Sequence, residues 1–306
     1  LSMSSQAAVK KINNKIRMTP GEKVGVTIIY GMLILFSLAF LMPFLYVVST
    51  SITSEKALAE NGVTLIPSSF SLDAYVYLFE YSKDILRAFF NTIIIAGATV
   101  VLMIVVTSLF AYPLSKKDLP GRTAILGYVM FSMMFGGGLI PTYILMHEYG
   151  FANNWLCMIL PGCFSAWNMI LVRNYFSSIP VELEESAFID GAGYFTILFR
   201  IIIPLAKPIL ATLTLFTVVG TWNNWYTALL YLSNQKKMWP IMMFLKTVLE
   251  STNPSTTLGM PVSGAFPPTE CLKMAAVLVC IFPILISYPF LQKYFVKGIM
   301  VGPIKG

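Results

Sequence analysis

The chain has 306 residues, of which 57% are hydrophobic and only 11% charged, and its mean hydropathy is +0.74. Soluble domains carry about 25% charged residues, so this chain has too little polar surface to cover its apolar side chains in water. The formal net charge is +7. No basic run interleaves with aromatic residues, which argues against a nucleic-acid-binding surface. We therefore expect an integral membrane protein.

The apolar segments predict an all-α fold. Residues 1–23 are polar and basic, and the apolar stretch after them is too long for a cleavable signal, so we expect a cytoplasmic tail followed by one transmembrane domain over 24–306. A helix needs about 20 mostly apolar residues to cross the hydrocarbon core. Uncharged windows predict six spans, namely Val24–Ser54, Ala88–Ser115, Thr123–Met146, Tyr149–Val172, Pro208–Gln235 and Met274–Gln292.

Basic residues in the connecting segments predict the orientation. Six spans place both ends of the chain on one side, and that side carries fourteen lysines and arginines against seven on the other. Because cytoplasmic loops are enriched in these residues, we expect both termini in the cytoplasm. The two long connectors, Glu55–Arg87 and Lys236–Lys273, are then extracellular.

Proline and glycine interrupt several of these windows. The interruptions are Pro43, Pro141, Pro161, Pro283 and the run Gly136–Gly138. One interpretation is kinking and close helix packing, which membrane bundles tolerate. The other is a pore lined by broken helices.

No residue pattern predicts a catalytic or metal-binding site. The cysteines form no CxxC pair, and three of the four lie in apolar stretches, as packing residues do. The single histidine, His147, ends the third window, and the windows hold no carboxylate with which it could relay protons. This argues against an ion-coupled secondary transporter and against a membrane-embedded hydrolase.

The connector Arg173–Lys207 is longer than two neighbouring helices require. Pro180 can begin a helix there, Gly191 can end it, and glutamates occupy its first turns, where they favour the helix dipole: Glu182, Glu184 and Glu185. Such a helix could lie on lipid headgroups or dock a soluble partner. Its acidic polar face favours docking, because membrane-surface helices are normally basic.

This connector also contains a motif. From Glu185 the sequence reads Glu-Ser-Ala-Phe-Ile-Asp-Gly-Ala, and Ile-Ile-Ile-Pro follows, ending at Pro204. It resembles the EAA motif of binding-protein-dependent ABC importer permeases, which reads Glu-Ala-Ala, three residues, Gly, nine residues, Ile, any residue, Leu-Pro. The spacing matches throughout, with Ser186 in place of Ala and Ile203 in place of Leu. From about Thr27 onward the chain resembles the carbohydrate branch of this family, close to the maltose-type inner subunit.

The resemblance implies a type I ABC importer permease fold, with six transmembrane helices and a cytoplasmic coupling helix in a loop over 178–208. It implies that the ATPase contacts are made by Glu185, Ser186, Ala187, Asp190, Gly191, Ala192 and Pro204. The expected partners are a second, non-identical permease, two ABC ATPase subunits and an extracellular solute-binding protein, in a bacterial cytoplasmic membrane. The chain itself has no GxxxxGK[ST] loop, so ATP and Mg²⁺ would be bound by the ATPase subunits.

The fifth window contains a candidate substrate path made of Trp222, Asn223 and Asn224. Aromatic rings stack on the CH faces of sugars, and amides hydrogen-bond to hydroxyl groups. The alternative is an aromatic belt at the membrane interface with asparagines packing between helices. Permeases for amino acids, metals or phosphonates also carry EAA loops, so a non-sugar solute is the alternative substrate.

Overall fold

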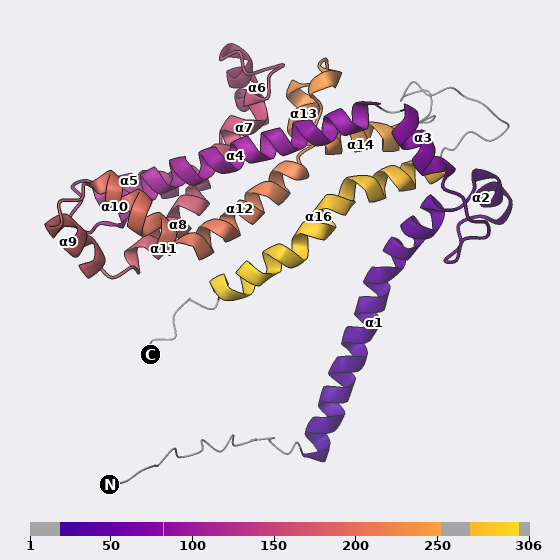
Figure 1. Cartoon of the computed structure of the whole chain (residues 1–306), viewed down its shortest axis with the longest axis horizontal. Helices are drawn as coiled ribbons and strands as arrows, with labels where there is room; N and C mark the ends of the chain where they lie inside the picture. Colours follow the sequence, from indigo (N-terminus) through magenta and orange to yellow (C-terminus); the bar gives the residue numbers. More distant parts are fainter. Residues whose placement is uncertain (1–18, 82, 252–269, 300–306) are drawn as a thin grey trace, which may run out of the picture.

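The computed structural model describes residues 19–81, 83–251 and 270–299, and its regular elements over these ranges are helices. The expected cytoplasmic tail lies outside the described residues up to residue 18. Figure 1 shows an elongated bundle with one helix, α1 (Pro20–Ser51), standing away from the rest.

The helix α4 (Lys83–Ser115) is the axis of the bundle. Its 33 residues correspond to a length of about 50 Å. In Figure 1 it runs from α3 (Asp73–Tyr81) at one end to α5 (Arg122–Met134) and α9 (Glu182–Ile189) at the other.

One face of α4 carries small residues at helical spacing, and all of them are buried: Thr92, Ala96, Thr99, Thr107 and Ala111. Small side chains let membrane helices approach closely. The helices packed against α4 are α7 (Leu156–Cys163), α8 (Ala166–Ser177) and α12 (Lys207–Trp222).

Three described helical segments are long and apolar enough to cross a membrane: Pro20–Ser51, Asp84–Ser115 and Leu156–Ser177. Two more candidates are bent pairs. The helix α5 meets α6 (Leu139–Glu148) at 111°, and the segment Tyr194–Leu205 meets α12 at 78°. The sixth expected span, Met274–Gln292, lies within α16 (Glu270–Ile299). The described residues thus offer up to five candidates, and the count of six stays a prediction.

Three expected spans have other boundaries than hydropathy predicted. The third is not one continuous helix, because Gly138 adopts φ +82° and the chain turns there. The fourth begins at Leu156 and continues to Ser177. In the fifth, the helix α12 ends at Trp222 and a separate helix, α13 (Tyr226–Tyr231), follows. At the start of α13 the Asn224 side chain accepts a hydrogen bond from the N–H of Thr227. An apolar window therefore located each span but not its breaks.

The helix α1 begins with a capping box. The Thr19 N–H donates to Glu22 Oε2 at 2.7 Å, and the Glu22 N–H donates to Thr19 Oγ1 at 3.4 Å. Beyond this cap its apolar side chains are exposed along most of the helix, and burial begins only at Ser49. Within the described residues α16 is its main neighbour. A helix that is apolar all round must be covered by lipid or by another protein.

Polar side chains fix the end of the bundle opposite α9. The Asn91 side chain donates to the carbonyl oxygens of Lys237 and Trp239, both at 2.9 Å. The Glu55 carboxylate, at the start of α2 (Glu55–Asn61), accepts from the N–H groups of Glu270 and Cys271 at 3.1 Å each. Glu55 therefore caps the N-terminus of a helix that lies far away in the sequence.

Candidate functional site

The short helix α9 lies at one end of the bundle and is bounded by turn signals. It begins two residues after Pro180, with glutamates in its first turn. It ends at Gly191, which adopts φ +81°. The Gly191 N–H donates to the Phe188 carbonyl at 3.0 Å and the Ala192 N–H to the Ala187 carbonyl at 2.9 Å, as in a Schellman motif. The expected start near Pro180 and stop at Gly191 are confirmed.

The two faces of α9 differ in chemistry. Glu184 and Ala187 are buried, whereas Glu185 and Asp190 are exposed. Large apolar side chains also face outward on and after this helix, with Ile189 86% exposed, and the others are Leu183, Phe188, Tyr194 and Phe195. The tip therefore presents a mixed acidic and apolar surface, as a protein-docking surface does.

Six of the seven residues expected to contact an ATPase lie on α9 or in the turn that follows it. Glu185, Ser186, Asp190 and Gly191 are exposed, Ala187 is buried and Ala192 is half-buried. The seventh, Pro204, is exposed in α11 (Ile203–Leu205), close to the bend that leads into α12. The segment between them consists of α10 (Tyr194–Ile197) and the π-helical turn Leu198–Ile202.

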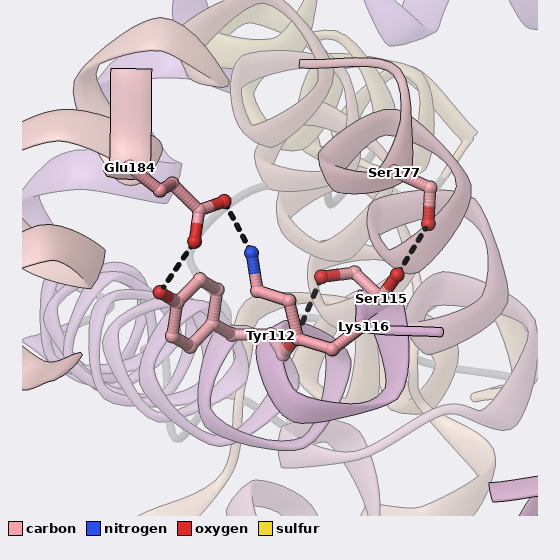
Figure 2. Close-up of polar contacts among 5 residues, drawn as sticks. All are labelled: Tyr112, Ser115, Lys116, Ser177 and Glu184. Carbon is pink, nitrogen blue, oxygen red and sulfur yellow. Dashed lines mark hydrogen bonds and ion pairs between the residues drawn. The ribbon is translucent and has the colours of Figure 1, made fainter. Parts of the chain in front are cut away.

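The buried side of α9 is held by Glu184, which is 4% exposed. It is the one buried acidic or basic side chain among those that the structure describes. Figure 2 shows its two partners at the end of α4: the Tyr112 hydroxyl donates to Oε2 at 2.9 Å, and Lys116 Nζ forms an ion pair with Oε1. The Lys116 Nζ also lies 4.7 Å from the centre of the Tyr112 ring.

The same end of α4 receives side chains from other helices. The Leu114 carbonyl accepts from Arg122 Nε at 3.0 Å and from Arg173 Nε at 3.1 Å. The Ser115 carbonyl accepts from Ser177 Oγ at 3.2 Å (Figure 2). Cations and donors at a helix C-terminus satisfy its free carbonyl groups. The end of α4 is therefore a common anchor for α5, α8 and α9.

A hollow of about 590 Å³ is lined by residues of α9, α10 and the end of α4. Its lining includes Asp118, Phe188 and Phe195 as well as the Glu184 carboxylate and its two partners. Phe188 and Tyr194 make an edge-to-face contact across the turn at Gly191, with their ring centres 5.0 Å apart. Ala187 packs in the same apolar core as Leu114 at the end of α4, and the contacts of Glu184 add a polar connection between α9 and α4.

Sequence reasoning counted Glu184 only as one of several glutamates in the first turn. The signal that could have found it was the spacing of Glu184 and Ala187, three residues apart and therefore on one helix face, together with Tyr112 and Lys116, four residues apart. Each pair occupies one face of its own helix.

The three residues expected in a substrate path are not brought together. Trp222 is buried, donates from Nε1 to the Cys280 carbonyl at 3.2 Å and packs against Phe89. The Asn223 side chain is exposed and donates back to the Val219 carbonyl. Asn224 alone lines a hollow.

That hollow has a volume of about 360 Å³ and lies where two helical segments are interrupted. One break separates α7 from α8, and the other separates α12 from α13. Among the residues that the structure describes, its lining has no charged side chain, and the polar ones are amides and hydroxyls: Asn168, Thr217, Thr221, Asn224 and Thr227. Non-helical backbone at membrane depth is tolerated where it lines a cavity, and transporters place binding sites at such breaks.

In a comparison with known proteins, most of the chain matches a single protein family. Residues 17–301 match the family described as binding-protein-dependent transport system inner membrane component. The chain is 39% identical to the protein LplC of Bacillus subtilis over 87% of its own length and 90% of that protein. It is 40% identical to the polygalacturonan/rhamnogalacturonan transport system permease protein YtcP of the same organism, covering 91% of the chain and 97% of YtcP.

A solved structure agrees with these sequence relatives. The chain superposes on a subunit of a bacterial ABC transporter involved in the import of the acidic polysaccharide alginate, with a TM-score of 0.83 and 32% sequence identity. The match covers 91% of this chain and 99% of that subunit. The expected ABC importer permease fold is thereby confirmed.

Proposed function

Since the chain belongs to the family of binding-protein-dependent transport system inner membrane components, we propose that it forms half of the translocation pore of an ATP-driven importer for an oligosaccharide or a related carbohydrate. Members of this family are transport permeases and not enzymes. The observation that carries the proposal is the helix α9, whose EAA spacing and exposed acidic and apolar face suit it to seat in an ATPase subunit. The names of the relatives, among them a polygalacturonan/rhamnogalacturonan permease and an arabinooligosaccharide permease, support a carbohydrate as the substrate.

In this proposal α9 and the turn at Gly191 form the coupling interface. Glu185 and Asp190 supply charge to the ATPase, Ile189 supplies an apolar contact, and the left-handed Gly191 turns the chain tightly enough for close approach. Ser186, Ala187, Ala192 and Pro204 shape the surface around them. ATP and Mg²⁺ are bound by the two ATPase subunits.

The chain requires a second, non-identical permease to complete the pore. The exposed apolar surface of α1 supports this, because a helix that leaves its own bundle offers its side to a neighbouring subunit as well as to lipid. An extracellular solute-binding protein delivers the substrate at the end of the bundle that holds α2 and α3. The protein lies in the bacterial cytoplasmic membrane with α9 and both termini in the cytoplasm.

Substrate contact is assigned to Asn224, with Asn168 and the threonines that line the same hollow. Amide and hydroxyl groups can exchange hydrogen bonds with sugar hydroxyls, and the lack of a charged lining residue suits an uncharged part of the substrate. Trp222 and Asn223 have hydrogen-bond partners within the protein and are not needed for this contact.

The transport cycle then has two states. Closure of the ATPase pair on ATP draws the coupling helices together and opens the pore outward, and hydrolysis lets them part and opens it inward. The permease is a two-state element that both ATP and the loaded binding protein bias. The chain performs no bond chemistry.

The test is purification of the tagged chain from its host, identification of what is recovered with it, and assay of ATP hydrolysis. We expect ATPase subunits and a second permease in the complex, and stimulation of hydrolysis by the binding protein with an oligogalacturonide or an arabino-oligosaccharide. Recovery as a self-sufficient monomer would contradict the complex. Stimulation by an amino acid or a metal alone would contradict the carbohydrate.

Two variants test the interface itself. Glu185→Lys reverses an exposed charge, and Gly191→Val places a β-branched residue at φ +81°, where it is strained. Both should insert normally, recover less ATPase and lose uptake. Full transport by both variants would refute the docking role of α9.

A further inference from the structure

We infer that Glu184, with Lys116 and Tyr112, is the joint through which movement of α9 is passed to α4. This rests on the proposed function, and it assigns the mechanical connection to a residue other than the ones that face the ATPase. Glu184 is a positioning residue, because it touches neither nucleotide nor substrate.

The first step of the argument is the position of the carboxylate. Glu184 is 4% exposed, whereas Glu185, about 100° further around the axis of α9, is exposed. Burying a carboxylate is costly unless a cation and further donors compensate it, and well-packed apolar residues would often stabilise as much. Stability alone therefore does not explain a glutamate at this position, whereas a fixed orientation between two helices does.

The second step is where the partners lie. Tyr112 and Lys116 are on the last turn of α4 and just beyond it, so both bonds of Glu184 connect α9 to a single helix (Figure 2). Beside them Ala187 of α9 packs in the same apolar core as Leu114 of α4, and the hollow of about 590 Å³ lies next to this contact. A push on α9 therefore reaches α4 through this network.

The third step is what α4 does with the movement. Its end also holds Arg122 of α5, and Arg173 and Ser177 of α8, through the carbonyl groups of Leu114 and Ser115. From there α4 runs the length of the bundle and packs against α7, α8, α12 and α14 (Ile241–Glu250). Through this packing α4 carries a displacement at its cytoplasmic end to helices on both sides of the substrate hollow.

The direct test measures a distance in the assembled transporter. Spin labels on the exposed positions Lys117, next to the end of α4, and Glu182, at the start of α9, report the distance between the two elements. We expect one distance in the nucleotide-free and ATP-bound states, because α9 and the end of α4 move together. A change of several ångströms between the states would overturn the inference, and this measurement leaves Glu184 intact.

The functional test uses Glu184→Ala and Lys116→Met in the complex reconstituted in liposomes with its binding protein and an oligogalacturonide or arabino-oligosaccharide. Both variants should retain their ATPase subunits and hydrolyse ATP, but sugar taken up per ATP should fall about tenfold, the usual size of a coupling effect. Glu184→Asp keeps the charge and should recover part of this ratio. An unchanged ratio in both of the first two variants would contradict the joint.

Two controls separate this inference from its premise. Glu182→Ala removes an exposed glutamate from the same turn of α9 and should leave the uptake per ATP unchanged. If the wild-type complex contains no ATPase or takes up no sugar, the proposed function fails. If the wild type transports and the Glu184 variants lose ATPase recovery instead of coupling, only the joint fails.

Discussion

Gly162 of α7 lies directly against Thr99 of α4: a Cβ added to Gly162 would meet Thr99 Cγ2 at 2.6 Å. Thr99 is fully buried, and its hydroxyl donates to the Ile95 carbonyl at 2.7 Å, which holds the rotamer. The contact between α7 and α4, beside the hollow that Asn168 and Asn224 line, therefore depends on the absence of a side chain at Gly162.

Gly162→Ala should destabilise the protein by about 1–3 kcal/mol, as overpacking of a close helix contact does. Thermal unfolding in detergent, followed with a maleimide dye that reacts with Cys157 as it becomes exposed, measures the effect. Thr99→Ser removes the opposing methyl group, so the double variant should regain most of the loss. Gly127→Ala, where the added atom meets open space, is the matched control, and an equal loss there would rule out the proposed clash.

Asn91 is the donor for two carbonyl groups of the segment before α14, those of Lys237 and Trp239. Asn91→Ala leaves both acceptors without this donor, at a cost of about 1–3 kcal/mol for each one that stays buried. Hydrogen exchange should accelerate in residues 236–241. Asn223→Ala, which removes an exposed amide bonded only within its own helix end, should leave this segment protected.

Cys271, at the start of α16, has a buried thiol. Burial first, and then the hydrogen bond to Glu55, raise the pKa of the Cys271 thiol above its ordinary value. Because the thiolate is the reactive form, alkylation of folded Cys271 should stay slow up to about pH 9, where an ordinary thiol is largely ionised. Mass spectrometry after a timed iodoacetamide pulse measures this rate. A rate that rises with pH like that of free cysteine would show that the site is open.

The raised pKa of the Cys271 thiol also determines how the stability of the protein changes with pH. The folded state holds a proton that the unfolded chain releases near its ordinary thiol pKa, about 8.5. The stabilisation from Cys271 is therefore complete below that pH and is lost as the pH rises towards the folded pKa. Cys271→Ser should flatten the fall of the melting temperature in alkaline buffer, and an identical fall in both proteins would contradict the linkage.

Trp222 donates to the Cys280 carbonyl from within the core shared by α12 and α16. Trp222→Phe should lower the free energy of unfolding by about 1–2 kcal/mol through the lost hydrogen bond and lost packing. The relative uptake of two oligosaccharides should not change. A changed preference at unchanged stability would instead place this side chain in the substrate path.

The limits of the fold prediction follow from what is local in a sequence. The helix α9 could be placed because its stop signal at Gly191 and its start near Pro180 lie within a few residues of the helix itself. The break at Gly138 was visible as a glycine run, but such a run does not fix the angle of 111°, because glycine adopts many backbone conformations. Apolar windows reported the spans without their ends, because lipid-facing and buried positions have similar composition.

The candidate site was found in part for the same reason. The EAA spacing is a local pattern and identified the exposed residues of α9. Glu184 gained its role from Tyr112 and Lys116, which lie 72 and 68 residues earlier in the chain. Trp222 and Asn224 are neighbours in sequence, yet a helix end between them sends one into the core and the other to a hollow.

The Glu55 carboxylate closes the start of α16 from 215 residues away, and α1 rests on that same helix. During synthesis α1 therefore enters the bilayer long before its neighbour within the chain exists. Until α16 emerges, the contacts of α1 within the described chain are those near its last turn, such as Ser49 Oγ with the Thr64 carbonyl and Ser51 Oγ with the Tyr75 hydroxyl, and contacts as distant in sequence as those with α16 form slowly. A chain that ends before α16 therefore lacks the helix against which α1 packs in this bundle, and the apolar side of its first helix stays open to lipid or to another subunit.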